Sequence, residues 1–280
     1  MSDLRRAGDV KVTRYEQRSA WSLGLAASDE HDFSSLAVSA EARSSSDDNN
    51  RTWNAGVAFT RDHISSSNNP TLQEKRRTLE ATAGVTQVLS RVDIVQLALT
   101  LSRGRGYFSD PYKSLDTRPA SRQQTITTLR WNHHLEAADV TVRSHWRHYA
   151  DTFGVSSYTL GLEAVLAAGS KVTITPSLRM YSQTAARFYY DPVYSYIGEP
   201  FPPGYLEAPP VFLSPDQRLA AFGAATIGVK VAWNFSDGWS TDIKIERYEQ
   251  RGVWQWAGHG SPGLAPFSAR FVQWGLSKKF

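Results

Sequence analysis

The sequence predicts an all-β fold, an antiparallel up-and-down transmembrane β-barrel, and three observations lead to this prediction. About 13 strand-like segments follow one another, each alternating between apolar and polar side chains. The connections between these segments alternate between long and short. The chain ends, at residues 268–280, in an amphipathic segment whose last residue is a phenylalanine.

The alternation recurs along the whole chain and is clearest in residues 218–235. There, Ile227, Val229 and Val231 share one face, while Thr226 and Lys230 share the other, as side chains of a strand must. No convincing helix interrupts the series, so we expect one domain over residues 1–280. The expected strands are 9–16, 21–27, 34–44, 52–61, 76–89, 92–102, 122–135, 139–149, 158–166, 171–182, 218–235, 239–250 and 268–280.

The lengths of the connections favour a membrane barrel over a soluble β-sandwich. Long connections lie at 62–75, 103–121, 183–217 and 249–267, and short ones lie at 17–20, 90–91, 135–138, 167–170 and 234–238. The remaining connections, at 28–33, 45–51 and 149–157, are of modest or moderate length. Outer-membrane barrels have short periplasmic turns and longer extracellular loops, whereas a sandwich does not sort its loops by end. The segments, of about 10 residues or more, also exceed the 5 or 6 usual in soluble sheets.

The C-terminal segment 268–280 has the pattern of a barrel-closing strand. Its apolar face carries Val272, Trp274, Leu276 and Phe280. Lys278 interrupts that face close to the end, where a lysine can extend to the membrane boundary. We expect this strand to be the contact for the barrel-assembly machinery. The alternative is the edge strand of a soluble sandwich, although the termini of soluble domains usually fray.

Counting strands backwards from Phe280 tests whether the chain contains all the strands of its barrel. With Phe280 at the periplasmic end, an odd number of strands places residue 9 at the extracellular end. Single-chain bacterial barrels normally have an even number of strands, and residues 1–9 lack the apolar stretch of a secretory signal. We therefore expect the chain to lack a signal peptide and an odd number of strands; the alternative is one strand split or merged in the count.

Composition narrows the functional classes. The net charge of +4 is scattered rather than clustered, so no basic stripe predicts nucleic-acid binding. Cysteine is absent, which excludes disulfides and thiol chemistry. No run of 18 apolar residues predicts a membrane-spanning helix. The 9 Trp and 12 Tyr are numerous enough to form aromatic belts at a membrane interface.

Several segments of the sequence resemble those of a known family. They include RRAGDVKVTRY at 5–15, GVTQVLSRVDIVQLALTLSRGRGYFSDPYK at 84–113, DQRLAAFGAATIGVKV at 216–231 and GSPGLAPFSARFVQWGLSKKF at 260–280. The chain resembles, over nearly its whole length, a family of bacterial outer-membrane barrel proteins designated as a domain of unknown function. The resemblance implies a bacterial outer-membrane location and a complete barrel of about 16 strands behind a signal peptide. It implies no activity and no catalytic residues.

Charged residues on the polar faces are the candidates for the barrel lumen. The main ones are Arg130, Arg143, Arg147, Arg179, Lys230, Lys244, Glu163 and Glu246. Neighbouring strands bring Arg143 or Arg147 close to Arg130, and Lys230 close to Lys244. Such a basic stripe can select anions in a water-filled pore. The alternative is a solvated wall in which Glu163 and Glu246 neutralise the bases.

The sequence offers little for catalysis, a cofactor or a metal. His133 and His134 point to opposite faces of one strand and cannot converge on a single metal ion. His259 and Ser261 lie together in a loop, but the surrounding GHGSP matches a turn-rich loop rather than a nucleophile elbow. We therefore expect no enzyme, and no catalytic, cofactor-binding or metal-binding residues.

The sequence thus leaves three functions open. A passive, porin-like pore for ions or small solutes in a Gram-negative outer membrane is the first. The second is a plugged structural or envelope-assembly barrel that docks a partner, because the loop at 183–217, rich in Pro, Tyr and Phe, is able to fold into the mouth. The third is an outer-membrane hydrolase using Ser261 and His259. The expected partners are outer-membrane lipid and the barrel-assembly machinery, whereas a solute or periplasmic partner is not specified.

Overall fold

The computed structural model describes residues 4–113, 115–191, 208–236, 238–256 and 258–279. Almost all regular structure there is extended, because the period-two alternation of the sequence suits strands with two different faces. The strands are β1 (Arg6–Tyr15), β2 (Ser19–Asp29), β3 (Phe33–Ser45), β4 (Arg51–Ile64), β5 (Glu74–Val88), β6 (Asp93–Gly106), β7 (Ser121–Leu135), β8 (Val140–Asp151), β9 (Ser156–Ala168), β10 (Val172–Gln183), β11 (Phe222–Ser236), β12 (Trp239–Arg251) and β13 (Phe267–Lys278). None of the helices in this part of the chain is long and apolar enough to cross a membrane.

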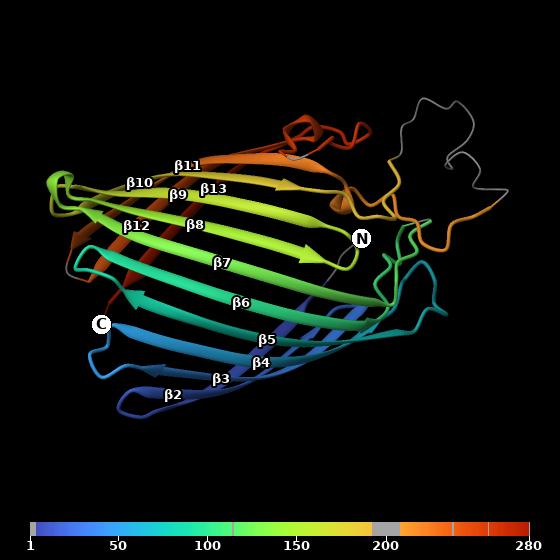
Figure 1. Cartoon of the computed structure of the whole chain (residues 1–280), viewed down its shortest axis with the longest axis horizontal. Helices are drawn as coiled ribbons and strands as arrows, with labels where there is room; N and C mark the ends of the chain where they lie inside the picture. The colour runs from blue at the N-terminus through green and yellow to red at the C-terminus, as the bar shows by residue number, and fades with distance from the viewer. Residues whose placement is uncertain (1–3, 114, 192–207, 237, 257, 280) are drawn as a thin grey trace.

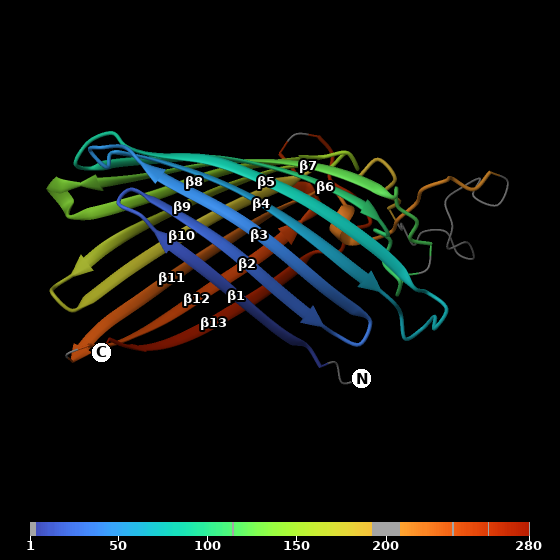
Figure 2. The same cartoon turned by 90° about the horizontal axis from the view of Figure 1, so that it is seen from below.

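The strands form a single antiparallel sheet that curls into a barrel (Figures 1 and 2). Each strand pairs with its neighbour in the sequence, from β1 to β13, so the predicted up-and-down topology is confirmed. Within the described residues, β1 and β13 are the two edges of the sheet and no hydrogen-bonded ladder joins them.

The two ends of the barrel differ, as the loop lengths predict. The N-terminus lies at the end where the long connections gather, and the C-terminus lies at the end with the short turns (Figure 1). We call these the long-loop end and the short-turn end. Of the described residues, the long-loop end contains 30–32, 65–73, 107–113, 115–120, 152–155, 184–191, 208–221, 252–256 and 258–266, and the short-turn end contains 16–18, 46–50, 89–92, 136–139, 169–171 and 238.

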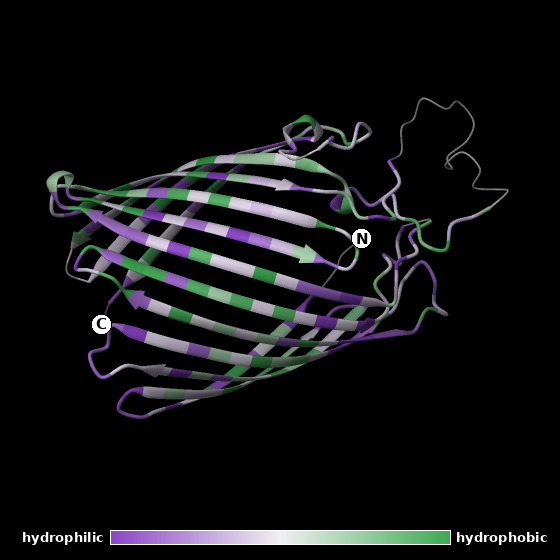
Figure 3. Cartoon of the chain, in the orientation of Figure 1, coloured by the Kyte–Doolittle hydropathy of each residue, from purple (hydrophilic) through white to green (hydrophobic). Residues whose placement is uncertain are grey.

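The outer face of the barrel is apolar across its middle. Along β6, Leu97, Leu99 and Leu101 point outward and are 42–50% exposed, while Gln96, Thr100 and Ser102 point inward. Figure 3 shows the same alternation of hydrophobic and hydrophilic residues along the other strands. Leaving so many large apolar side chains in water is unfavourable, so this outer face is suited to lipid.

The buried side chains of the barrel gather at the long-loop end. Phe153 is 1% exposed and packs with Val155, Ala186 and Leu219. A second cluster joins Ala220, Phe222, Ala224 and Leu264. The described loop residues in these clusters are therefore packed against the wall of the barrel and against one another.

Most strands end within a few residues of their predicted boundaries, and the largest shortening is at the start of β11. We expected a strand from residue 218, but residues Gln217–Leu219 form a 3-10 turn and β11 begins only at Phe222. The cause is a cap: the Asp216 carboxylate accepts a hydrogen bond from the backbone N–H of Arg218. Capping of this kind competes locally with extended structure, although the apolar alternation continues through the turn.

Candidate functional site in the lumen

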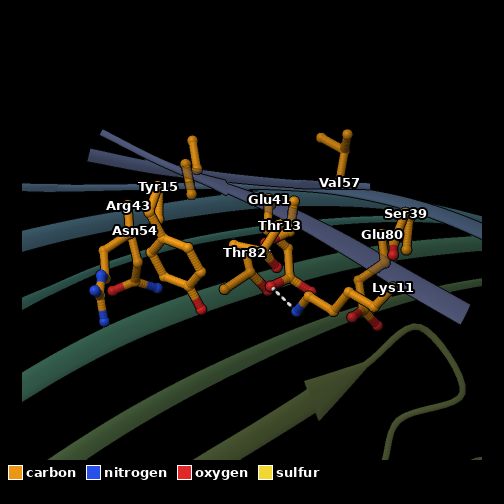
Figure 4. A pocket seen from close by; sticks show the side chains of 16 residues that line it. Lys11, Thr13, Tyr15, Ser39, Glu41, Arg43, Asn54, Val57, Glu80 and Thr82 are labelled. Atoms are coloured by element: carbon orange, nitrogen blue, oxygen red, sulfur yellow. Dashed lines mark hydrogen bonds and ion pairs between the residues drawn. The ribbon is translucent and has the colours of Figure 1, made fainter. Parts of the chain in front are cut away.

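The inner face of strands β1–β5 lines a polar cavity of about 630 Å³. Figure 4 shows Lys11, Glu41 and Glu80 pointing to the same side of the sheet, into the lumen. Val57, which belongs to the opposite face of β4, points the other way. The polar lining is made of Lys11, Thr13, Tyr15, Ser22, Ser39, Glu41, Arg43, Asn54, Glu80 and Thr82.

A second cavity of about 580 Å³ lies along the inner face of β8–β13. Its charged lining includes Glu163, Arg179, Lys244 and Glu246, all of them predicted lumen residues. Phe271 also lines it, because Val272 and Trp274 point outward and Phe271 therefore points inward. Because Phe271 and Val272 are both apolar, the sequence pattern alone did not identify Phe271 as a residue of the lumen.

The lumen lysines are neutralised by carboxylates. The Lys11 ammonium lies 2.6 Å from a Glu41 carboxylate oxygen, and the Lys244 ammonium lies 2.9 Å from Glu246. Lys230 and Lys244 are directly opposite in the register, as predicted, but Lys230 turns to Asp242 at 3.5 Å. These lysines therefore contribute little net charge to the lumen.

The lumen arginines are not neutralised in this way. Within the described residues, no carboxylate lies within ion-pair distance of Arg130, Arg143, Arg147 or Arg179. Arg143 is opposite Glu163 in the β8–β9 register, yet the two side chains form no ion pair. Arg130 instead donates to the side chain of Gln96 at 3.4 Å.

Three of the basic residues share one row of the sheet. Arg130 on β7 is opposite His145 on β8, which is opposite Gly161 on β9, which is opposite Arg179 on β10. Arg143 and Arg147 flank His145 on its own strand and point to the same face. The wall from β7 to β10 therefore carries a band of positive charge, which we call the lumen arginine band: Arg130, Arg143, Arg147 and Arg179.

Loop residues cover part of the lumen at the long-loop end. Gln183 points inward from β10, and its amide donates to the carbonyl oxygens of Arg218 at 3.1 Å and Ala220 at 2.6 Å. Tyr189 packs against both buried clusters. The predicted aromatic loop at 183–217 thus lies against the inner wall at both of its ends, while residues 192–207 lie outside the described part of the chain.

A buried charge cluster ties two of these loops together. The Asp216 carboxylate, with no exposed side-chain surface, contacts the Lys113 ammonium at 2.9 Å and the guanidinium groups of Arg118 at 2.7 Å and Arg218 at 2.6 Å. Burial raises the pKa of Asp216, but hydrogen bonds from Arg218, Lys113 and Arg118 outweigh it and hold the pKa well below its usual range. Arg218 also reaches Asp110 at 2.8 Å. We call Asp216 and its three cations the loop latch.

Ser261, one of the residues considered for catalysis, belongs to the loop packing at the mouth. The Ser261 hydroxyl accepts from the backbone N–H of Ala221 at 2.9 Å, and no hydrogen bond joins it to His259 in the described chain. His133 contacts Asp93 at 2.8 Å on the outer face. Among the described residues, no group of three or more His, Cys, Asp and Glu side chains has the arrangement of a metal site.

The C-terminal strand has the predicted facing. Val272, Trp274 and Leu276 point outward and are more than half exposed, and the Trp274 indole donates to the Thr241 hydroxyl at 2.9 Å. The Lys278 ammonium lies 4.9 Å above the ring of Trp239 at the short-turn end. Phe280 lies outside the described residues.

Comparison with known proteins agrees with this architecture. A family model described as "Protein of unknown function (DUF3570)" matches residues 1–271. The chain belongs to the DUF3570 family. Comparison with curated proteins finds no match for this DUF3570 chain.

Solved structures show which fold the DUF3570 chain has. It is similar to the siderophore receptor PirA from Pseudomonas aeruginosa, with a TM-score of 0.61 at 10% identity over 98% of this chain and 55% of that one. The ferric enterobactin receptor PfeA from the same organism matches with a TM-score of 0.57 at 11% identity, over 89% and 43%. CdiB from Acinetobacter baumannii matches with a TM-score of 0.56 at 8% identity, over 96% and 50%.

These likenesses concern the fold alone, because the identities are low. The chain spans about half the length of the solved structures that it matches. The predicted fold class, an antiparallel transmembrane β-barrel of the outer-membrane type, is confirmed.

Proposed function

We propose that this DUF3570 protein is a passive pore of the bacterial outer membrane that conducts ions or small solutes and performs no chemistry. The observation that carries the proposal is the polar inner wall with its two cavities, of about 630 and 580 Å³, beneath an apolar outer face. A polar, charged interior of this kind is the wall that a water-filled channel requires.

The orientation follows from the loops. Outer-membrane barrels keep short turns on the periplasmic side and longer loops outside, so the long-loop end faces the exterior. A solute entering from outside first meets the covered mouth, with the loop latch, and then the lumen arginine band.

The charge of the lumen supports a preference for anions. Lys11, Lys230 and Lys244 are paired with carboxylates, whereas the four arginines of the band are not. Arg130 and Arg179 lie in one hydrogen-bonded row, on either side of His145. Because a wall with low dielectric behind it focuses the field of such charges, the local concentration of small anions rises.

Planar-bilayer recording of the full-length protein tests both parts of the proposal. We expect discrete conductance steps. In a potassium chloride gradient, we expect the zero-current potential to lie closer to the equilibrium potential of chloride than to that of potassium. Arg130→Gln with Arg179→Gln shifts that potential toward cation preference, whereas Arg247→Gln on the outer face leaves it unchanged. Absence of conductance steps contradicts the pore; steps without selectivity contradict only the anion preference.

A second candidate is a plugged structural or assembly barrel that docks an envelope partner. The favouring observation is the cover over the mouth, where Gln183 and the clusters around Phe153 and Phe222 hold loop residues against the inner wall. Persistent closure in the bilayer, together with a periplasmic protein that co-purifies in fixed ratio, supports this candidate over the pore. A hydrolase at Ser261 requires a substrate whose turnover is lost on Ser261→Ala, and we propose none.

A further inference from the structure

Four arginines form a basic patch on the outer face of the barrel, close to the long-loop end. They are Arg61 on β4, Arg77 on β5, and Arg103 and Arg105 on β6. All four are exposed. Their strand neighbours show that they point outward: Phe59 precedes Arg61 on the same face, Leu79 follows Arg77, and Leu101 precedes Arg103. We call this set the outer arginine patch.

The register brings these charges together. Arg61 is directly opposite Arg77, and Arg77 is directly opposite Arg105, so the three form one row across β4, β5 and β6. Arg103 is opposite Leu79, one step nearer to the middle of the barrel. Directly opposite side chains have Cβ atoms about 4.5–5.5 Å apart, a spacing at which like charges destabilise a sheet.

No acidic residue offsets this repulsion. Among the described residues, none of the four arginines has a carboxylate within ion-pair distance. The row continues to Leu36 on β3 and to Ser121 on β7, neither of which carries charge.

Two outward arginines on β12 at the same end differ from the patch, although Arg270 on β13, directly opposite Arg247, has no carboxylate within ion-pair distance among the described residues. On β12, Arg247 and Arg251 flank Glu249, and both guanidinium groups contact its carboxylate. The outer face therefore neutralises its arginines on β12 but not on β4–β6. Binding of an anion from outside the chain lowers the cost of placing Arg61, Arg77 and Arg105 in one row.

The height of the patch on the barrel identifies the source of that anion. Phe59, Leu79 and Leu101 are 42–57% exposed, and each lies two residues from an arginine of the patch, toward the middle of the barrel. On each of these strands, the outer surface thus changes from apolar to positively charged within two residues. At the border of the apolar core, a bilayer presents its polar headgroups, and these carry the phosphates.

We propose that the outer arginine patch binds the phosphate groups of a lipid headgroup in the outer leaflet. The inference rests on the proposed orientation in the outer membrane but not on pore activity. A guanidinium group donates two parallel hydrogen bonds to a phosphate, so a row of three suits a headgroup that bears more than one phosphate. Phosphate bridging Arg61, Arg77 and Arg105 fixes the lipid against β4–β6 and shields the like charges from one another.

Native mass spectrometry of the full-length protein, in detergent with added diphosphorylated lipid A or its dephosphorylated form, tests this site. We expect the phosphorylated lipid to stay bound and the dephosphorylated form to dissociate. Arg77→Gln with Arg105→Gln weakens binding about 30-fold, the factor for two surface cations acting on an anionic headgroup. Binding also weakens with salt, because exposed charges are screened.

The matched control is Arg247→Gln with Arg251→Gln, which removes the same charge from the same end and face of the barrel. It leaves lipid binding unchanged if the patch is the site. Equal loss in both variants, or equal binding of the two lipids, overturns the proposal. The heat-modifiable gel band of each variant reports barrel folding separately, and Arg103→Gln alone provides a milder change should the double variant not fold.

The two proposals, the pore and the outer arginine patch, can fail independently of each other. A protein that binds the phosphorylated lipid but shows no conductance contradicts the pore and leaves the patch standing. A protein that conducts but binds both lipids alike contradicts the patch and leaves the pore standing.

Discussion

The imidazole of His145 covers the bare backbone of Gly161 on the neighbouring strand. A Cβ atom built on Gly161 would lie 1.9 Å from Cε1 of the ring, so no side chain larger than hydrogen fits beneath it. Because the two residues are directly opposite in the β8–β9 register, this glycine holds the ring against the wall between Arg130 and Arg179. The ring therefore does not extend into the lumen where the positive charge is concentrated.

Gly161→Ala is therefore expected to push the His145 ring into the lumen and lower single-channel conductance. The clash involves the end of a side chain rather than backbone, so the loss of stability falls at the low end of the roughly 1–3 kcal/mol seen for overpacking. Planar-bilayer recording measures the conductance and urea unfolding the stability. In a His145→Ala background the same substitution has no effect on conductance; a persistent effect there refutes the steric explanation.

Phe153→Ala is expected to loosen the loops at the mouth without unfolding the barrel. The Phe153 ring lies 5.8 Å from Phe108 and 5.0 Å from Phe188, and the Arg122 guanidinium lies 4.7 Å above it. Removal of such a buried ring costs about 3–5 kcal/mol of local packing. Limited trypsin digestion then cuts within 107–120 or 184–191 much faster, while Phe59→Ala, on the outer face, serves as the control with unchanged cleavage.

Asp216→Asn is expected to open the loop latch. The substitution leaves three cations, Lys113, Arg118 and Arg218, without the carboxylate that they share. Arg118 keeps its contact with Asp116 and Arg218 keeps its contact with Asp110, so the loss of stability is smaller than the roughly 3–5 kcal/mol for a buried charge left without a partner. Hydrogen exchange at residues 213–220 should rise measurably, whereas the strand amides of β5 and β6 keep their protection. Unchanged exchange at 213–220 shows that packing alone holds the loops.

The loop latch is also expected to resist mild acid. The pKa of Asp216 in the folded protein lies below the value of about 3.9 for an unfolded aspartate, so its contribution to stability is fully present above that value. It declines only as the pH falls further, through the folded pKa. Exchange at 213–220, corrected for the intrinsic rate, should match between pH 7 and pH 5. A rise already within that interval contradicts a lowered pKa.

The sequence was sufficient for the fold because the signals that define it are local. Period-two alternation within each strand and the contrast between long and short connections need no knowledge of distant contacts, and both are confirmed. The start of β11 was wrong because a single cap at Asp216 overrides the alternation through 218–221.

The mouth could not be predicted in the same way. Arg118 and Asp216 are 98 residues apart, and nothing in either neighbourhood marks them as partners. The outer arginine patch is partly predictable. The alternation of each strand shows which face its arginine is on, but only the register of β4, β5 and β6 shows that Arg61, Arg77 and Arg105 share a row. Pairing across strands is thus the information that the sequence alone lacks.

The C-terminal strand offers the sharpest test of which face meets lipid, because adjacent residues point to opposite sides. Trp274 points outward and is 68% exposed, while Gln273 points into the lumen opposite Lys244. Trp274→Arg is expected to cost about 2–4 kcal/mol near the membrane midplane and less toward its edge. Gln273→Arg places the same charge in a hydrated interior and should change stability by less than about 1 kcal/mol. Urea unfolding in lipid vesicles measures both; equal losses for the two variants would show that β13 does not separate lipid from lumen.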